Sequence, residues 1–375
     1  MNGTVAAGYE PVREQFAAVV AAEPGLGAQL AVYRYGRLVV DLSAGMAADA
    51  LTALYSTAKG AAHLVVAWLV QHGALDLDRT VSSYWPQFTG EGKEELTLRD
   101  LLAHRSGVIG VDGGLRTEEL ADDRVLADRL ASQRPYWRPG RAYGYHAFVI
   151  GALTGEVVRR ATGHTIQQHY QRQLRAPFGL DFHLGLPATE EPRYVPVQPA
   201  TESRPGAGSD PTSLTAIAFN QHATPPTDLV EYGNTRLVRA LGPASSGGVG
   251  SARGLAGLYA AAVTGLDGRP ALLHEQTVAR FARVHSHGTD LVTGERDHFA
   301  LGFEAQPQRY PFLGARTLGH SGAIGAHGFA DAELGLAYGY TRRRFVAGGG
   351  GGAPENQRLA LAAVHAARRA DRGQR

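Results

Sequence analysis

The sequence predicts an α/β (α+β) protein in which both chain ends build a sheet flanked by helices and the middle builds a mainly helical lobe. β-prone runs occur near both ends, within 28–42 and 299–340, and helix-type patterns dominate between them. The chain also has 375 residues, more than the roughly 250–300 at which single cores stop growing. We therefore expect residues 1–58 and 240–375 to form the sheet domain and residues 59–239 the helical domain.

Each expected element follows from a local sequence pattern. Short runs rich in β-branched, aromatic and leucine residues predict strands, and longer apolar runs closed by glycine predict helices. The strands are expected at 28–33, 38–42, 299–304, 315–319, 326–330 and 334–340, the first two joined by a Tyr35-Gly36 turn. The helices are expected at 61–72, 252–262 and 355–370. The segment 190–226 is rich in Pro, Ser, Thr and Gly and is expected to be a surface loop that shapes the mouth of a cleft.

Composition excludes several classes of protein. The net charge is only +2, so neither nucleic acid nor an anionic membrane is an expected partner. The absence of cysteine excludes disulfides, thiolate metal sites and cysteine nucleophiles. The N-terminus lacks the pattern of a signal peptide, and no run of about 18 apolar residues occurs. We therefore expect a cytoplasmic protein that does not cross a membrane.

The chemistry-bearing residues begin with Ser56-Thr57-Ala58-Lys59, at the N-terminal end of the helix expected over 61–72. Residues three apart share one helix face, so the Ser56 hydroxyl and the Lys59 amine can meet. A serine hydroxyl needs a neighbouring base to become a nucleophile, and burial of Lys59 in an apolar run would lower its pKa enough for that role. Lysine is also rare here, since Lys93 is the only other one. The alternative is an ordinary serine and lysine on a surface helix.

Two later segments could complete a site. A tyrosine following Pro139-Gly140 can present its phenol to a cleft; Tyr145 and Tyr143 both compete for this role, and a packed aromatic is the alternative for each. Small residues around Ser321 and Gly322 allow a ligand to approach the backbone of a late strand. His320 beside them either contacts a substrate or makes only a local hydrogen bond.

Together, in this order, the three segments resemble the serine β-lactamase and penicillin-binding-protein superfamily, most closely the family VIII carboxylesterases and the class C β-lactamase-like proteins. Residues 101–107, Leu-Leu-Ala-His-Arg-Ser-Gly, are similar to a further segment of that family. Gly151, residues 161–163 and residues 245–258 also fit, and the resemblance extends over roughly residues 27–340. It implies a β-lactamase-like fold with an antiparallel sheet flanked by helices plus an all-helical lobe.

The resemblance also assigns roles to residues. It implies that Ser56 is the acylated serine, that Lys59 and Tyr145 handle its proton, and that the backbone N–H groups of Ser56 and Ala323 form the oxyanion hole. The substrate-binding residues that it implies, in place of the family's Lys-Thr-Gly, are His320, Ser321 and Gly322. It implies an acyl-enzyme reaction on a small ester or amide, of EC class 3.1.1, with no metal and no organic cofactor.

Two departures from the family pattern favour the esterase branch. Ala147 stands where the family's Tyr-x-Asn motif has asparagine, and His320 stands where Lys-Thr-Gly has lysine. The first removes an amide used on β-lactam side chains, and the second removes a permanent cation that holds a carboxylate. Histidine can be neutral near pH 7, which suits an uncharged substrate.

Other interpretations remain open beside this one. The stretch Gly319 to Ala323 approaches the Gly-x-Ser-x-Gly of α/β-hydrolases but lacks its last glycine. A metal site could be built from a histidine-rich polar stretch, but its spacing is not helical, and solvated loop residues explain it better. The residues concerned are His285, His287, Asp290 and His298. The same acyl-enzyme could also serve an acyltransferase or a biosynthetic cyclase, and the scaffold could be a non-catalytic binding module.

Overall fold

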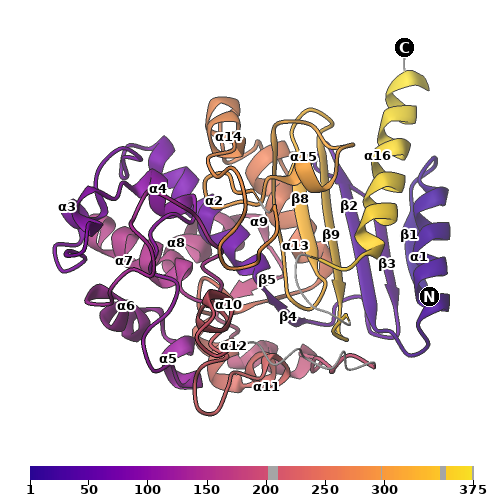
Figure 1. Cartoon of the computed structure of the whole chain (residues 1–375). Helices are drawn as coiled ribbons and strands as arrows, with labels where there is room; N and C mark the ends of the chain where they lie inside the picture. Colours follow the sequence, from indigo (N-terminus) through magenta and orange to yellow (C-terminus); the bar gives the residue numbers. More distant parts are fainter. Residues whose placement is uncertain (202–209, 297, 347–351, 374–375) are drawn as a thin grey trace.

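The main sheet is built from the two ends of the chain, as predicted (Figure 1). The computed structural model describes residues 1–201, 210–296, 298–346 and 352–373. The strands of this sheet are β1 (Asn2–Val5), β2 (Ala28–Arg34), β3 (Arg37–Ala44), β7 (Thr317–Ser321), β8 (His327–Asp331) and β9 (Leu336–Arg342). Their order is β1-β3-β2-β9-β8-β7, and every neighbouring pair is antiparallel. The expected hairpin corresponds to β2 and β3.

Helices cover both faces of the sheet, and β2 is therefore buried on both sides. Leu30 and Val32 belong to the core that contains α1 (Glu10–Ala22) and α16 (Glu355–Gly373). Ala31 and Tyr33, which alternate with them, belong to the larger core on the other face. Alternation of this kind follows from the two-residue period of a strand. The larger core also receives α2 (Thr57–Gln71) and α13 (Ala252–Tyr259), so the helix that begins after Ser56 is anchored deep in the molecule.

The rest of the molecule is mainly helical and lies on the side of the sheet away from α1 and α16 (Figure 1). Its first helices are α3 (Val81–Tyr84), α4 (Leu98–Leu102), α5 (Thr117–Ala121), α6 (Asp123–Ala131), α7 (Ile150–Thr162), α8 (Ile166–Tyr170) and α9 (Ala176–Phe178). Later ones are α10 (Leu214–Ala218), α11 (Leu229–Asn234), α12 (Arg236–Leu241) and α14 (Glu275–Ala282). The short helix α15 (Gln306–Arg309) lies instead beside β7, and the carbonyl of Arg309 accepts a hydrogen bond from Gln357 of α16. A fold with an antiparallel sheet, flanking helices and a helical lobe is therefore observed.

A second, three-stranded sheet joins distant parts of the chain. It has the order β4-β6-β5, with β4 (Thr52–Tyr55), β5 (Phe182–Leu184) and β6 (Gly248–Gly250). The strand β5 comes from the middle of the sequence, whereas its partner β6 comes from the C-terminal part. The predicted domain boundaries at residues 58/59 and 239/240 stay a prediction. What matters for function is that β4 ends at Tyr55, immediately before Ser56.

The structure corrects one predicted strand and refines one predicted loop. Residues 299–304 form a tight turn with a single isolated bridge between Phe299 and Glu304. Gly302 takes a φ of +80° there, and the N–H of Ala300 donates to the carbonyl of Phe303, so the chain reverses instead of extending. The expected loop over 190–226 contains α10 in its described part, and residues 202–209 of it lie outside the described residues.

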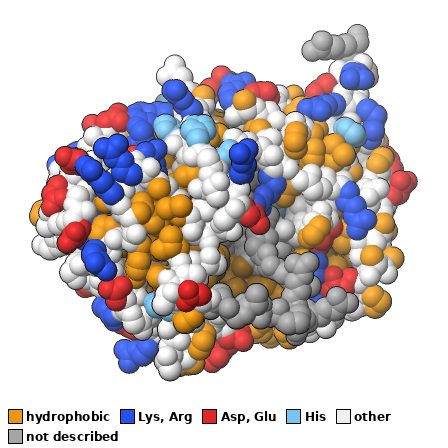
Figure 2. Space-filling view, in the orientation of Figure 1, with side chains coloured by type: hydrophobic (Ala, Val, Ile, Leu, Met, Phe, Trp, Pro, Cys, Tyr) orange, Lys and Arg blue, Asp and Glu red, His pale blue; other side chains and the backbone are white. Residues whose placement is uncertain are grey.

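Charged side chains of both signs occur on the face of the molecule shown in Figure 2. Figure 2 shows acidic and basic side chains interspersed over this face, as the net charge of +2 suggests. Over the described part of the chain, the helices lack the combination of length and apolar character needed to cross a bilayer. The cytoplasmic location stays a prediction.

Candidate active site

Ser56 lies at a sharp turn from strand to helix. It caps the N-terminus of α2, yet its hydroxyl makes no capping hydrogen bond within the described residues. The preceding Tyr55 has a φ of +49°, a left-handed conformation that costs a non-glycine residue energy. The Tyr55 hydroxyl donates to the carbonyl of Leu229 at 2.7 Å, which helps to hold this turn. The Ser56 hydroxyl is thus presented at a helix N-terminus, where developing negative charge is stabilised.

Lys59 lies directly beside Ser56, as their spacing predicts. Its Nζ is 3.1 Å from Ser56 Oγ, and it donates to the carbonyls of Ala147 at 2.6 Å and Ser245 at 2.7 Å. The side chain is fully buried, and burial lowers its pKa to about 7, against a smaller opposing effect of Glu304. A neutral amine has two protons, which the two carbonyls accept, and one lone pair, which is left for the Ser56 hydroxyl. This arrangement suits a general base.

Tyr145, and not its rival Tyr143, is the tyrosine that reaches Ser56. The Tyr145 hydroxyl donates to Ser56 Oγ at 2.8 Å, whereas the Tyr143 hydroxyl donates to the carbonyl of Gly288. The Tyr145 ring stacks on Phe299 with an interplanar angle of 4°. Its backbone N–H donates to the buried carboxylate of Asp290 at 3.1 Å. Backbone and ring are therefore both fixed, and the phenol is held against the serine.

Replacing Tyr145 with phenylalanine tests the importance of this phenol. We expect kcat on a neutral ester to fall about 10²–10⁴-fold, the usual contribution of a positioned proton-transfer group. The fold should persist, because the phenylalanine ring can keep the stacking on Phe299. Steady-state kinetics beside thermal unfolding curves check this. A variant that unfolds like the native protein and retains native kcat would contradict a role for the phenol in proton transfer.

The three residues in the place of Lys-Thr-Gly are not equivalent in space. Ser321 and Gly322 line the same cavity as Ser56, as does Ala323, whose N–H the oxyanion hole would use. His320 is fully buried and is not among the cavity-lining residues. The reason is the period of β7, since neighbouring residues of a strand point to opposite faces. A direct contact of His320 with substrate therefore does not fit its position and forms no part of our proposal.

His320 instead supports the wall behind the cavity. Its Nδ1 donates to the carbonyl of Ser321 at 2.7 Å, and its ring lies 6.2 Å from that of Tyr145, measured between centroids. Burial lowers the pKa of His320, so the ring is neutral near pH 7. The permanent positive charge of the lysine in the family's Lys-Thr-Gly motif is accordingly missing at this position.

Glu304 is a cavity residue that sequence reasoning missed. It follows the tight turn at 299–303, and its carboxylate lies beside Ser321. Its pKa is lowered to about 2, because the attraction of His320 and Arg309 and a hydrogen bond from Ser321 outweigh the opposing effect of burial. The sequence does carry one signal for this residue, since Glu304 is an acidic residue at the end of the apolar run 299–303. The prediction of a strand over 299–304 did not include the turn that brings Glu304 to the cavity.

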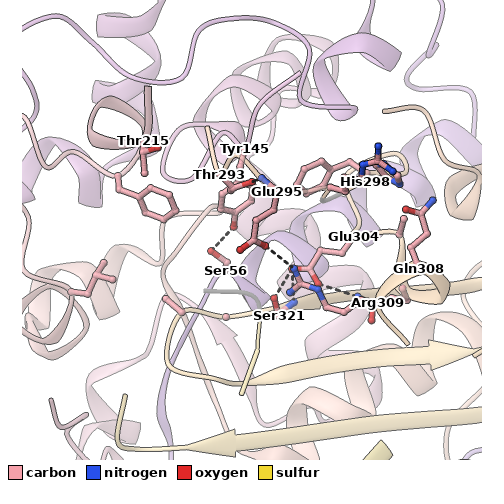
Figure 3. A pocket seen from close by; sticks show the side chains of 18 of the residues that line it. Ser56, Tyr145, Thr215, Thr293, Glu295, His298, Glu304, Gln308, Arg309 and Ser321 are labelled. Atoms are coloured by element: carbon pink, nitrogen blue, oxygen red, sulfur yellow. Dashed lines mark hydrogen bonds and ion pairs between the residues drawn. The ribbon is translucent and has the colours of Figure 1, made fainter. Parts of the chain in front are cut away.

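Ser56 and Tyr145 open onto a cavity of about 640 Å³ (Figure 3). Apolar side chains form part of its lining, namely Phe219, Leu229, Phe299 and Phe345. Polar and charged side chains form another part, namely Glu295, Arg296, His298, Glu304, Gln308 and Arg309. Thr215 of α10 lies on one side of Ser56 in the view, and Glu304 and Arg309 lie on the other. A cavity of this size accommodates a small organic molecule.

The histidine-rich stretch does not form a metal centre in the described part of the chain. No group of three or more potential ligands is found among the described residues. Asp290 is instead committed to backbone N–H groups, accepting from Tyr145 and from Val292. His298 lines the cavity next to the charged side chains.

Comparisons with known proteins show the family of the chain. The family described as Beta-lactamase matches residues 13–362. The Esterase/beta-lactamase LipL of Mycobacterium tuberculosis is 29% identical, covering 85% of this chain and 77% of LipL. The structure of EstA from Arthrobacter nitroguajacolicus is 40% identical, with a TM-score of 0.92, and covers 98% of this chain and 99% of EstA. A family VIII carboxylesterase structure is 31% identical, with a TM-score of 0.86, over 97% and 99% of the two chains.

Proposed function

The chain belongs to the beta-lactamase family, and we propose that it is a serine hydrolase of the carboxylesterase type that cleaves a small ester or amide through an acyl-Ser56 intermediate. One observation carries this proposal: Tyr145 Oη at 2.8 Å and Lys59 Nζ at 3.1 Å converge on Ser56 Oγ. The names of the similar proteins, an esterase/beta-lactamase and a family VIII carboxylesterase, support ester cleavage.

In the first half of the reaction, Ser56 Oγ attacks the substrate carbonyl while Lys59 and Tyr145 accept its proton as one coupled unit. The lone pair of the neutral Lys59 amine is aimed at the hydroxyl, because both amine protons are held by backbone carbonyls. Negative charge then develops on the carbonyl oxygen. The backbone N–H groups of Ser56 and Ala323 would hold that oxyanion, assisted by the N-terminal end of the α2 dipole.

In the second half, the same pair returns a proton to the leaving group and then activates water. The Tyr145 phenol is hydrogen-bonded to Ser56 and lines the cavity, which places it to protonate a departing alcohol. Attack of water on the acyl-enzyme releases the acid and restores Ser56. The apolar lining offers a place for an uncharged acyl or alcohol group. The buried, neutral His320 supplies no cation for a carboxylate, which favours ester over β-lactam substrates.

The acyl-enzyme is directly testable by intact-mass spectrometry. We expect brief incubation with a fluorophosphonate probe to add one label per protein, with peptide mapping placing it on Ser56. Incubation with p-nitrophenyl butyrate should release nitrophenol. Ser321→Ala is the matched control, because Ser321 lines the same cavity but its hydroxyl donates to Glu304, a carboxylate whose pKa of about 2 makes it too weak a base to activate a serine. Folded Ser321→Ala should still be labelled at Ser56. In the native protein, a label on Ser321, or no label on folded protein, would refute the proposal.

A further inference from the structure

Glu304 and Ser321 form a fixed pair in the wall of the cavity. The Ser321 hydroxyl donates to Glu304 Oε1 at 2.5 Å, and the Ser321 backbone N–H donates to the same oxygen at 3.2 Å. The other carboxylate oxygen, Oε2, accepts from the side-chain amide of Gln306 at 3.1 Å. The Glu304 side chain remains 19% exposed and lines the cavity with Ser321 and Gln306. The pair is therefore accessible from the space in which a substrate would bind.

The hydrogen bonds of this pair decide what it can offer to a substrate. A serine hydroxyl has a single proton, and that of Ser321 is committed to Glu304. What remains toward the cavity is lone pairs, on Ser321 Oγ and on the carboxylate. A substrate carboxylate placed here would meet acceptors and a like charge, both of which are unfavourable. A substrate N–H or ammonium group would find the partners that it needs.

The surrounding charges favour the ionised form of Glu304. The groups that act on it are His320, Arg309 and His327, all of which favour its charged form. His320 and His327 are buried, and burial lowers the pKa of each, to about 4 for His327. Arg309 carries a full charge but also lies 3.9 Å from Glu295. One guanidinium is thus shared between two carboxylates that line the same cavity.

We propose that Glu304, with Ser321 held against it, is a specificity-determining residue that makes this side of the cleft accept a hydrogen-bond donor of the substrate, an ammonium group above all, and reject a carboxylate. The inference rests on the proposed esterase function and names the substrate class of that same site. The preferred substrate is an ester or amide with an amine or other donor on the arm that lies against Ser321.

Two series of matched esters test the proposal, one for each arm of a substrate. In the acyl series, p-nitrophenyl heptanoate is compared with p-nitrophenyl 6-aminohexanoate and mono-p-nitrophenyl pimelate. In the alcohol series, 4-methylpentyl butyrate is compared with 3-(dimethylamino)propyl and 3-carboxypropyl butyrates. Within each series the chains are similar in length and differ mainly in charge. In at least one series we expect kcat/KM for the ammonium ester to exceed that for the carboxylate ester by about tenfold or more.

Two variants identify the source of the discrimination. Glu304→Gln keeps an oxygen that can accept from Ser321 but removes the charge, so the ammonium-to-carboxylate ratio should fall to within about twofold of unity. Glu295→Gln is the matched control: it removes a carboxylate from the same cavity, but one that is 69% exposed. Its ratio should stay well above that of Glu304→Gln, because Glu304 keeps its charge. In the native protein the ratio should also decrease as salt increases, since the interaction is electrostatic.

Failure of this inference differs from failure of the proposed function. Turnover of the neutral esters with no charge discrimination in either series would overturn the inference and leave the esterase intact. Discrimination that survives in folded Glu304→Gln would also overturn it, because another group would then be the source. Absence of turnover of both neutral esters would instead count against the proposed function itself. The native comparison needs no variant, so the test stands even where Glu304→Gln fails to fold.

Discussion

Ser56→Ala should lower kcat on p-nitrophenyl butyrate by about 10⁴-fold or more, since loss of a nucleophile removes the acyl-enzyme route altogether. The fold should survive, because the Ser56 hydroxyl makes no capping bond to α2. Its partners, Tyr145 and Lys59, keep their other contacts to Phe299 and to the carbonyls of Ala147 and Ser245. Steady-state kinetics of the native protein and the variant measure the loss of kcat, and thermal unfolding curves of both check that the variant is folded.

Ser106→Ala is the control for this experiment. Ser106 Oγ lies 2.6 Å from His146 Nε2, so it is a second serine in contact with a possible base. Both residues are completely buried and neither lines the cavity. Folded Ser106→Ala should therefore keep kcat within about tenfold of native. Loss of turnover in Ser106→Ala with retention in Ser56→Ala would identify the wrong serine and end the acyl-Ser56 scheme.

The parts of the site that were predictable are those fixed by local geometry. Ser56 and Lys59 are three residues apart on one helix, so the helix alone brings them together. Tyr145 is 89 residues away from Ser56 in sequence, and no periodicity relates the two. Its assignment depended on its position after Pro139-Gly140 within a known family pattern, which also left Tyr143 as a rival. The structure separates the two tyrosines by what their hydroxyls contact.

The parts that were missed depend on contacts that a linear pattern does not contain. Glu304 reaches the cavity because Gly302 reverses the chain, and it becomes a site residue only through its bonds to Ser321 on β7. The resemblance implies that the neighbouring residues His320 and Ser321 both bind substrate. Adjacent residues of one strand point to opposite faces, so the two expectations were incompatible once 317–321 formed a strand. The carbonyls that hold Lys59, from Ala147 and Ser245, could not be read from side-chain identities at all.

Lys59→Arg should lower kcat/KM by about 10³–10⁴-fold, because arginine keeps the positive charge but cannot act as a base at accessible pH. The native protein has a pKa of about 7 for Lys59, lowered chiefly by burial. The neutral amine is the active form, so native kcat/KM should fall as pH decreases through about 7 and level off above it. That acid limb should be absent from the residual activity of Lys59→Arg. Measurements between about pH 5 and 9 give both results.

Lys93→Arg is the matched control, since Lys93 is the other lysine of the chain and is equally buried. Lys93 also donates to two backbone carbonyls, those of Ala131 and Gln133, but it does not line the cavity. Its replacement should leave kcat/KM and the acid limb at native values. Arginine is larger than lysine, so Lys59→Met, which is unbranched and carries no base, repeats the test with less crowding. If both Lys59 variants fold and their kcat/KM still decreases below about pH 7 as in the native protein, the titrating base is a residue other than Lys59.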